Sequence, residues 1–270
     1  MPVFLKPGDV MGSFIWYELM AGDGDRAAAF YAAVTGWKIG PGDPNLHGYR
    51  LIRRDDGGNL GGLLPLSQDM KSFGARPAWM PYLHVKNVET ALAAILADGG
   101  RVLVPPVTID AGTFAMVNDP QGVPIYIMAP VPPPGQPDAR SDVFSRTGMQ
   151  RVSWNELATP DLAAAKAFYA RHFGFEFNES MPMGPMGDYC FIDAGGERVG
   201  AMMQHQGGPE TPLWIPVFRV PSVQAAAAAI TGHGGGAVRG PMQVPGGEWV
   251  VFATDPDGAR FGLVSSGEKP

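Results

Sequence analysis

The stretch Trp16-Tyr17-Glu18-Leu19 returns in the second half of the chain as Trp154-Asn155-Glu156-Leu157. Three further matches keep the same spacing or nearly the same: Phe30-Tyr31 with Phe168-Tyr169, Gly36-Trp37 with Gly174-Phe175, and Asp119-Pro120-Gln121-Gly122 with Asp255-Pro256-Asp257-Gly258. Matches that recur in the same order indicate an internal repeat. The sequence therefore predicts two fused copies of one domain.

The length and one proline-rich stretch set the expected domain limits. A chain of 270 residues is long enough for about two ordinary domains. The prolines that follow residue 130 stiffen the backbone and disfavour a helix or a central strand there. We predict an N-terminal domain over 1–130, a proline-rich linker over 131–148 and a C-terminal domain over 149–270.

Each copy contains the same order of elements twice, namely a strand, a short helix and then shorter strands. Phe14–Leu19 alternates like a strand, and Asp25–Thr35 is an alanine-rich helix that ends before Gly36. The next module begins with a strand at Trp79–Val85 and a helix at Val88–Ala97. Helices of about ten residues among many strands predict an α+β fold with one-sided sheets.

The composition excludes several classes of protein. A formal net charge of -6, with no run of Lys or Arg, is a poor match for nucleic acid. The single cysteine, Cys190, excludes a disulfide framework, and the first residues lack the pattern of a secretory signal. Every apolar run is too short to span a bilayer. We therefore expect a cytoplasmic protein that binds neither nucleic acid nor membranes.

The repeated motifs resemble a known family. The Asp25-Arg26-Ala27-Ala28-Ala29-Phe30-Tyr31 stretch before Gly36-Trp37, its counterpart Ala165-Lys166-Ala167-Phe168-Tyr169 before Gly174-Phe175, and the two Asp-Pro-x-Gly turns resemble those of the vicinal oxygen chelate superfamily. This superfamily includes glyoxalase I, extradiol dioxygenases and bleomycin-resistance proteins. The Trp-x-Glu-Leu strands resemble a subgroup of two-domain glyoxalase-like proteins described as hydroxylases or antigens. The resemblance implies two tandem glyoxalase-like domains, each made of two βαβββ modules around a cup-shaped sheet.

The same resemblance implies a metal in each cup, typically bound by two His and one Glu. This chain has other residues at the matching positions: Trp16, Met80 and Tyr126 in the first copy, and Trp154, Ile215 and Gly262 in the second. Divalent transition metals need imidazole, carboxylate or thiolate donors. We therefore expect no bound metal and no cofactor.

Strand alternation indicates which side chains line the cups. Among the lining residues we expect catalytic roles for Glu18, His84 and Glu156. A carboxylate in an apolar cup has a raised pKa, and a histidine titrates near neutrality, so both kinds of group suit proton transfer. Structural roles for the two carboxylates, with His84 and Arg219 as their respective partners, stay open. Arg219 is also a candidate ligand-binding residue, as are Trp16, Met80, Tyr82, Tyr126 and Trp154. The first cup is favoured because its lining is richer in polar groups.

Three classes of function fit these observations. The first is a protein that binds or sequesters a small organic ligand without a metal, in the manner of bleomycin-resistance proteins. The second is a lyase or a hydroxylase-type enzyme that acts on a carbonyl or aromatic substrate, with Glu18 or Glu156 as the base. The third is a structural or interaction protein whose cups are filled by its own side chains. A homodimer is compatible with each class.

Overall fold

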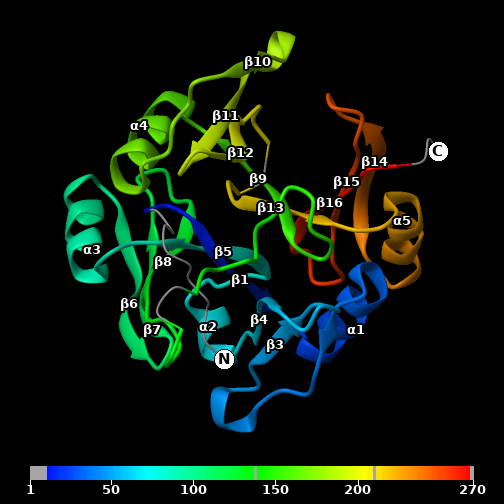
Figure 1. Cartoon of the computed structure of the whole chain (residues 1–270), viewed down its shortest axis with the longest axis horizontal. Helices are drawn as coiled ribbons and strands as arrows, with labels where there is room; N and C mark the ends of the chain where they lie inside the picture. Colours follow the sequence, from blue (N-terminus) through cyan, green and yellow to red (C-terminus); the bar gives the residue numbers. More distant parts are fainter. Residues whose placement is uncertain (1–10, 137–138, 209–210, 268–270) are drawn as a thin grey trace. The chain divides into compact units, whose positions relative to one another are not determined.

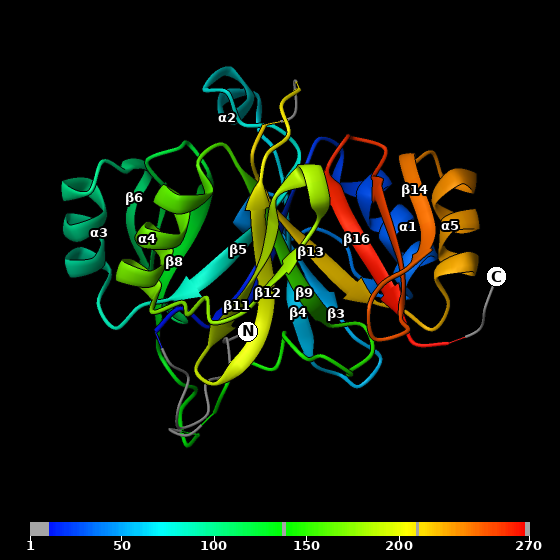
Figure 2. The same ribbon diagram turned by 90° about the horizontal axis from the view of Figure 1, so that it is seen from above.

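The computed structural model describes residues 11–136, 139–208 and 211–267 (Figures 1 and 2). Two residues of the expected linker, 137 and 138, lie outside the described residues, as do residues 1–10 of the expected N-terminal domain and 209–210 and 268–270 of the C-terminal one. Among the described residues, no helix is long and apolar enough to cross a membrane.

The first repeat contains two modules of the expected type. The first module is β1 (Phe14–Ala21), α1 (Gly24–Thr35), β2 (Lys38–Ile39), β3 (Arg50–Arg53) and β4 (Asn59–Pro65). After the short helix α2 (Gln68–Ser72), the second module is β5 (Ala78–His84), α3 (Val88–Ala97), β6 (Arg101–Ile109), β7 (Gly112–Asn118) and β8 (Pro124–Pro130).

The second repeat follows the same order. Its modules are β9 (Val152–Thr159), α4 (Leu162–Phe173), β10 (Ser180–Pro182), β11 (Asp188–Ala194) and β12 (Glu197–Gln204), then β13 (Trp214–Arg219), α5 (Val223–Gly232), β14 (Gly236–Gln243), β15 (Trp249–Thr254) and β16 (Arg260–Ser265).

The two sheets have the same topology. Their strand orders are β2-β3-β4-β1-β5-β8-β7-β6 and β10-β11-β12-β9-β13-β16-β15-β14, which become identical when eight is added to each number of the first. In each module the first strand pairs in parallel with the last, as β1 does with β4 and β9 with β12. The predicted α+β fold of two βαβββ modules per repeat is confirmed.

Helix ends follow the residues that the sequence supplies. Asp23, Asn87, Asp161 and Ser222 each accept hydrogen bonds from backbone N–H groups of the first helical turn, which have no partner within the helix. Gly36 and Gly174 end α1 and α4 with φ of 78° and 68°. A residue with a Cβ is disfavoured in this left-handed conformation, which explains why both repeats have glycine there.

The described chain packs as two compact units, and each unit contains one module from each repeat. Of the described residues, unit 1 contains 11–16, 80–136, 139–142, 154–208 and 211–214, and unit 2 contains 17–79, 143–153 and 215–267. Helices from the two repeats pack together inside each unit, as α1 and α5 do in unit 2 and α3 and α4 in unit 1 (Figure 1). The two repeats therefore share their cores.

A buried hydrogen-bond chain connects the repeats within unit 2. The Trp79 indole donates to the Tyr31 hydroxyl at 2.8 Å, and that hydroxyl donates to Oδ2 of Asp255 at 3.3 Å. Asp255 opens the Asp-Pro-x-Gly turn of the other repeat, and its Oδ1 accepts from the backbone N–H groups of Asp257 and Ala259. One carboxylate thus closes its own turn and anchors the helix of the neighbouring module.

Unit 1 repeats this arrangement in a looser form. Trp214 donates to the Tyr169 hydroxyl at 3.0 Å, and this hydroxyl faces Asp119 of the first repeat. Oδ2 of Asp119 is buried, yet it has no partner at normal hydrogen-bond distance in the described part of the chain. Burial is the main cause that raises the pKa of this carboxyl. The docking geometry is therefore shared, while the last hydrogen bond is formed only in unit 2.

The third residue of each Asp-Pro-x-Gly turn contacts the start of a helix from the other repeat. In unit 1, Oε1 of Gln121 accepts from the Asp161 backbone N–H at 2.6 Å, before α4. In unit 2, Oδ2 of Asp257 accepts from the Asp23 backbone N–H at 2.9 Å, before α1. These contacts explain why the turn motif recurs, since each turn is a docking element as well as a chain reversal.

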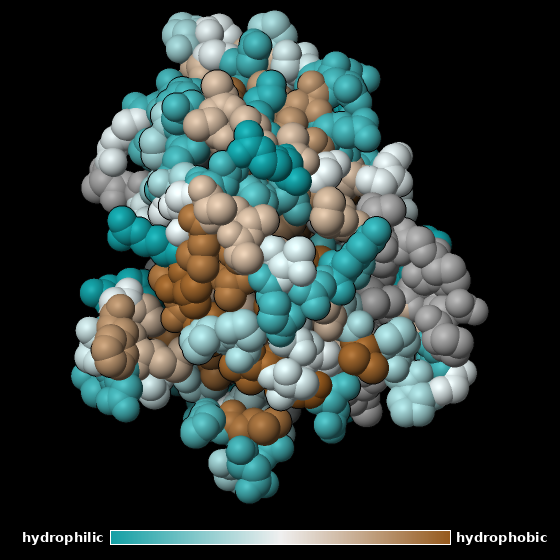
Figure 3. Space-filling model, turned by 90° about the vertical axis from the view of Figure 1, so that its left-hand side faces the viewer, coloured by the Kyte–Doolittle hydropathy of each residue, from teal (hydrophilic) through white to brown (hydrophobic). Residues whose placement is uncertain are grey.

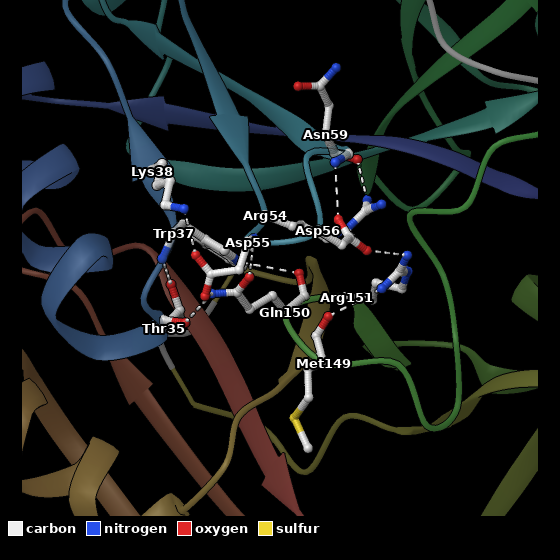
Figure 4. A network of polar contacts seen from close by, with 11 residues as sticks. Thr35, Trp37, Lys38, Arg54, Asp55, Asp56, Asn59, Met149, Gln150 and Arg151 are labelled. Carbon is white, nitrogen blue, oxygen red and sulfur yellow. Dashed lines mark hydrogen bonds and ion pairs between the residues drawn. The ribbon is translucent and has the colours of Figure 1, made fainter.

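Gln150 fixes the segment before β9 to the first module of unit 2 (Figure 4). Its amide accepts from the Asp55 backbone N–H at 2.7 Å and donates to the Thr35 carbonyl and the Asp55 carboxylate, both at 3.2 Å. Its own carbonyl accepts from the Trp37 indole at 3.1 Å. Arg151 next to it donates to Asp56 at 2.7 Å. The backbone of Gln150 has a φ of 60°, a value that residues other than glycine seldom adopt. The contacts of its side chain and carbonyl hold it in this conformation.

Strand β6 forms one edge of the first sheet and exposes apolar side chains. Leu103 and Ile109 are 46% and 49% exposed, and Leu96 of the adjacent helix α3 is 45% exposed. Figure 3 faces the side of the molecule on which α3 and α4 lie in Figure 1 and shows apolar atoms gathered among polar ones. Pro105 and Pro106 lack N–H donors, and prolines on an edge strand hinder its pairing with a further strand.

Candidate functional site

Strand β9 presents two of the predicted residues on its more accessible face. Trp154 and Glu156 are half-buried, whereas Asn155 and Leu157 between and beyond them are fully buried. Successive residues of a strand point to opposite faces of the sheet. The Trp-x-Glu pattern thus places an indole and a carboxyl side by side on one face.

Neighbouring strands add two aromatic rings to this face. Glu156 is level with Ala201 of β12, Ala201 is paired with Phe191 of β11, and Tyr189 lies two residues before Phe191. The intervening Cys190 points the other way, since its sulfur lies 3.8 Å from Nζ of Lys166 on helix α4. Tyr189 and Phe191 therefore lie on the face opposite α4. We call Trp154, Glu156, Tyr189 and Phe191 the C-terminal site.

Hydrogen bonds connect three of the four residues. The Trp154 indole donates to the Tyr189 hydroxyl at 2.8 Å, and that hydroxyl donates to Oε2 of Glu156 at 2.7 Å. The tyrosine oxygen accepts a hydrogen bond from the indole and donates one to the carboxyl. The indole proton therefore points to the tyrosine, and the tyrosine proton points to the carboxyl. The carboxyl is consequently held in one orientation by the half-buried Tyr189.

The electrostatics of the C-terminal site follow from burial. Burial raises the pKa of the Glu156 carboxyl, and the hydrogen bond from Tyr189 opposes this rise without cancelling it. Burial, together with the nearby Glu156 charge, raises the pKa of Tyr189 well above its ordinary value. The phenol therefore stays protonated as a donor, and the carboxyl holds its proton to a higher pH than an exposed glutamate does.

One oxygen of Glu156 is available to a ligand. Its Oε2 accepts from Tyr189, whereas Oε1 has no hydrogen-bond partner among the described residues and is not one of the fully buried atoms. A carboxyl that is anchored through one oxygen presents the other in a fixed direction. This arrangement suits the recognition of a hydroxyl or carbonyl group.

Phe191 and Arg198 support the aromatic side of the site. The Phe191 ring packs edge to face with Trp154 and Tyr189, with centroid distances of 6.1 and 5.7 Å. The Arg198 guanidinium lies 4.6 Å from the centroid of Phe191, on the ring face, and donates to Asp193 at 3.0 Å. These contacts fix the orientation of the rings. The aromatic side chains therefore lose little conformational entropy when a flat molecule binds to them.

The pairing of Glu156 with Arg219, which the sequence left open, is wrong. Arg219 is buried in unit 2, where it donates to Glu248 at 2.5 Å and to Ser153 at 3.1 Å. Its Nε is buried and has no hydrogen-bond partner in the described ranges. Glu248 lies just before β15, far from Glu156 in sequence, and the alternation of β13 alone could not indicate it.

The favoured residues of the N-terminal repeat are more deeply buried. Trp16, Glu18, Met80, Tyr82 and Tyr126 are each less than 8% exposed. Tyr82 and Tyr126 stack on each other at 4.2 Å, and the Phe114 ring lies at the edge of Tyr126. His84 is half-buried at the end of β5, where its backbone pairs with Ser13. The more accessible set therefore lies in the C-terminal repeat.

Sequence reasoning did not include Tyr189 or Phe191 in the site. A signal was present, because Tyr49-Arg50-Leu51-Ile52 matches Tyr189-Cys190-Phe191-Ile192 at a spacing close to that of the other repeated motifs. The loop before this strand differs in length between the repeats, which hid the match. For metals, no group of three or more His, Cys, Asp or Glu that could hold an ion is present in the described residues. The expectation of a metal-free protein stays a prediction.

Two family models match the chain. Residues 17–128 match the model of a glyoxalase-like domain, and residues 151–263 match that of the Glyoxalase/Bleomycin resistance protein/Dioxygenase superfamily. Together these ranges cover most of the chain, with one match in each repeat.

Similar proteins share both repeats with this chain. "Putative glyoxylase CFP32" of Mycobacterium tuberculosis is 27% identical over 256 residues, which are 92% of this chain and 93% of that protein. "Anthracycline biosynthesis protein DauV" of a Streptomyces species is 24% identical over 270 residues, 94% of this chain and 93% of that protein.

Solved structures with the same fold include two dioxygenases. An extradiol ring-cleaving dioxygenase from Brevibacterium fuscum superposes with a TM-score of 0.64 at 18% identity and covers 99% of this chain and 75% of its own. The halotolerant catechol dioxygenase BphC gives a TM-score of 0.62 at 15% identity, over 94% of this chain and 87% of its own. Each family match corresponds to one eight-stranded sheet. The chain belongs to the glyoxalase, bleomycin resistance protein and dioxygenase superfamily, with two such domains in tandem.

Proposed function

We propose that the protein binds a small organic molecule at the C-terminal site. The observation that supports this most directly is the fixed Glu156 carboxyl, which is anchored by Tyr189 through one oxygen and accessible through the other. The tyrosine fixes the direction of the second oxygen, so a ligand that reaches it loses little side-chain freedom on binding.

The chemistry of the site indicates a flat molecule with a hydroxyl or carbonyl oxygen. Trp154 and Phe191 supply aromatic surface, and protonated Glu156 donates to a carbonyl, while the ionised form accepts from a hydroxyl. One relative is named for anthracycline biosynthesis, and anthracyclines are polycyclic aromatic ketones with phenolic hydroxyls. A hydroxyanthraquinone is therefore the first ligand to test.

A second candidate function is proton transfer on a bound carbonyl compound. The raised pKa of Glu156 favours it, because a general base or acid works best when its pKa lies near the working pH. One relative bears the name of a glyoxylase. In this case the protein is a lyase or a hydroxylase-type enzyme, and binding is its first step.

Equilibrium dialysis with 1,4-dihydroxyanthraquinone tests the binding proposal. Glu156→Met keeps the length of the side chain but removes both oxygens, so we expect the affinity to fall about tenfold, the worth of one hydrogen bond of roughly 1.4 kcal/mol. Glu197→Met is the matched control, because Glu197 is an exposed glutamate at the start of β12. Equal affinity of both variants would refute the site.

Glu156→Gln separates binding from catalysis. The amide still accepts from Tyr189 and offers N–H groups to a carbonyl, so a binding protein keeps its affinity. An amide cannot take up a proton as a base, so an enzyme loses turnover. The substrate for this test is a carbonyl compound with a C–H group next to the carbonyl, and mass spectrometry after incubation in deuterated water reports the deuterium bound to carbon. No gain of carbon-bound deuterium with the wild-type protein excludes proton transfer on that compound.

A further inference from the structure

The N-terminal repeat has a tyrosine at the place that Tyr189 occupies in the C-terminal repeat. In the first sheet Glu18 is level with Gly62, and Gly62 is paired with Leu51, two residues after Tyr49. In the second sheet Glu156, Ala201 and Phe191 are related in the same way, and Tyr189 lies two residues before Phe191. Strand register, independently of sequence alignment, thus makes Tyr49 the counterpart of Tyr189.

Gly62 makes room for the Tyr49 hydroxyl. A Cβ at Gly62 would lie 1.8 Å from that oxygen and 2.1 Å from Cζ of the same ring, so no larger residue fits with the ring in this position. The backbone of Gly62 does not have a positive φ. Glycine is therefore required at position 62 because the Tyr49 ring occupies the space of a side chain. The backbone conformation there does not itself require glycine.

Tyr49 and Glu18 share one face of the sheet. Arg50 and Leu63 lie on the other face, since Arg50 donates to Asp25 of α1 and Leu63 contacts the start of the same helix. Tyr49 and Gly62 therefore point away from α1. Residues that are level with each other on paired parallel strands point to the same side, so the Glu18 side chain leaves β1 next to the space that the Tyr49 hydroxyl fills.

We propose that Tyr49 and Glu18 form a phenol–carboxyl pair like that of Tyr189 and Glu156, and that this pair is a second site for an oxygen-bearing organic molecule. The pair lies wholly within unit 2, whereas the C-terminal site lies within unit 1. Its binding role rests on the function proposed above. The chain then holds two ligands, one in each repeat.

The two pairs differ in their surroundings, which predicts unequal affinities. Leu51 replaces Phe191, so the N-terminal pair lacks the aromatic ring that packs on Tyr189. Glu18 is 5% exposed, while Tyr49 is half-exposed. A ligand therefore meets the phenol first, and we expect weaker binding in the N-terminal repeat.

Carboxyl carbon NMR tests the pair without any ligand. With glutamate side-chain carboxyls labelled with ¹³C, Tyr49→Phe is expected to shift the Glu18 resonance and leave Glu156 unchanged, and Tyr189→Phe is expected to do the reverse. Gly62→Ala pushes the tyrosine ring aside and should shift Glu18 as Tyr49→Phe does. A Glu18 resonance that responds to neither Tyr49→Phe nor Gly62→Ala would overturn the pair.

Ligand counting tests the second site. Equilibrium dialysis with 1,4-dihydroxyanthraquinone should give two bound molecules per chain, with Glu18→Met weakening one of the two sites about tenfold and Glu156→Met weakening the other. One bound molecule in the wild-type protein, with an affinity that falls in Glu156→Met and is unchanged in Glu18→Met, would overturn the second site and leave the proposed function intact. No binding to the wild-type protein would refute the proposed function, and the NMR result would still decide whether the pair exists.

Discussion

Asp255 is expected to make the stability of the protein depend on pH in an unusual direction. Asp255 is 3% exposed. Its carboxyl accepts hydrogen bonds from two backbone N–H groups of its own turn and from the Tyr31 hydroxyl. Burial is the largest cause that raises its pKa from 3.8 to about 6, and the backbone hydrogen bonds only partly oppose it. The folded protein therefore holds this proton more tightly than the unfolded chain.

The magnitude follows from the two pKa values. A pKa that moves from 3.8 to about 6 corresponds to roughly 3 kcal/mol, at about 1.4 kcal/mol for each pH unit. Because the folded state binds the proton more strongly, this stability is fully present below about pH 4. It is lost as the pH rises through about 6, where the buried carboxyl must ionise.

Asp255→Asn isolates this contribution. Asparagine keeps an oxygen for the backbone N–H groups of the turn but does not titrate. The free energy of unfolding is measured by urea titration at pH 4 and at pH 7. Between these two pH values the variant should gain about 2 kcal/mol relative to the wild-type protein, because most but not all of the contribution of Asp255 is lost in this window. Asp110→Asn is the control, since Asp110 is exposed. If the difference between wild-type protein and variant is the same at both pH values, within the error of the urea titrations, the reasoning is refuted.

Three further predictions concern the other groups described above. Gln150→Ala removes three side-chain hydrogen bonds and should lower the free energy of unfolding by about 1–3 kcal/mol in urea titrations, whereas exposed Gln68→Ala should change it by less than about 0.5 kcal/mol. Glu248→Gln leaves the buried Arg219 charge without its counter-charge and should cost about 3 kcal/mol in the same assay; a near-neutral result would mean that water replaces the carboxylate. The purified protein is expected to contain no stoichiometric zinc, iron, manganese or nickel by plasma mass spectrometry, and one tightly bound ion per chain would contradict the expectation drawn from Trp16, Met80 and Tyr126.

The elements and the fold class could be predicted from the sequence because they depend on local signals. Apolar alternation indicated the strand that contains Trp154 and Glu156, and glycine at 36 and 174 marked the ends of two helices correctly. The repeat doubled each of these signals. Local patterns therefore sufficed for the modules and for the family.

The partners within the site depend on strand register, which a single sequence does not specify. Nothing near Glu156 in the chain indicates Tyr189, which is 33 residues away and reaches it only because β12 lies between β9 and β11. Arg219 was a candidate partner of Glu156 because both were expected to face the second cup, yet the turn between β14 and β15 places Glu248 at hydrogen-bond distance from Arg219 instead. The role of the Asp-Pro-x-Gly turns was missed for the same reason, since each acts on the other repeat.

This exchange of contacts determines what a single repeat can do alone. The N-terminal repeat contributes the Trp79–Tyr31 donor pair to unit 2 and the Asp119 turn to unit 1, and in the full chain both are matched by the C-terminal repeat. Expressed by itself, the N-terminal repeat would leave both of these docking surfaces without their partners. Two copies related by a two-fold axis would satisfy both at once. A single repeat would thus form this assembly as a dimer whose population depends on protein concentration. In the full chain the covalent connection between the repeats removes that dependence.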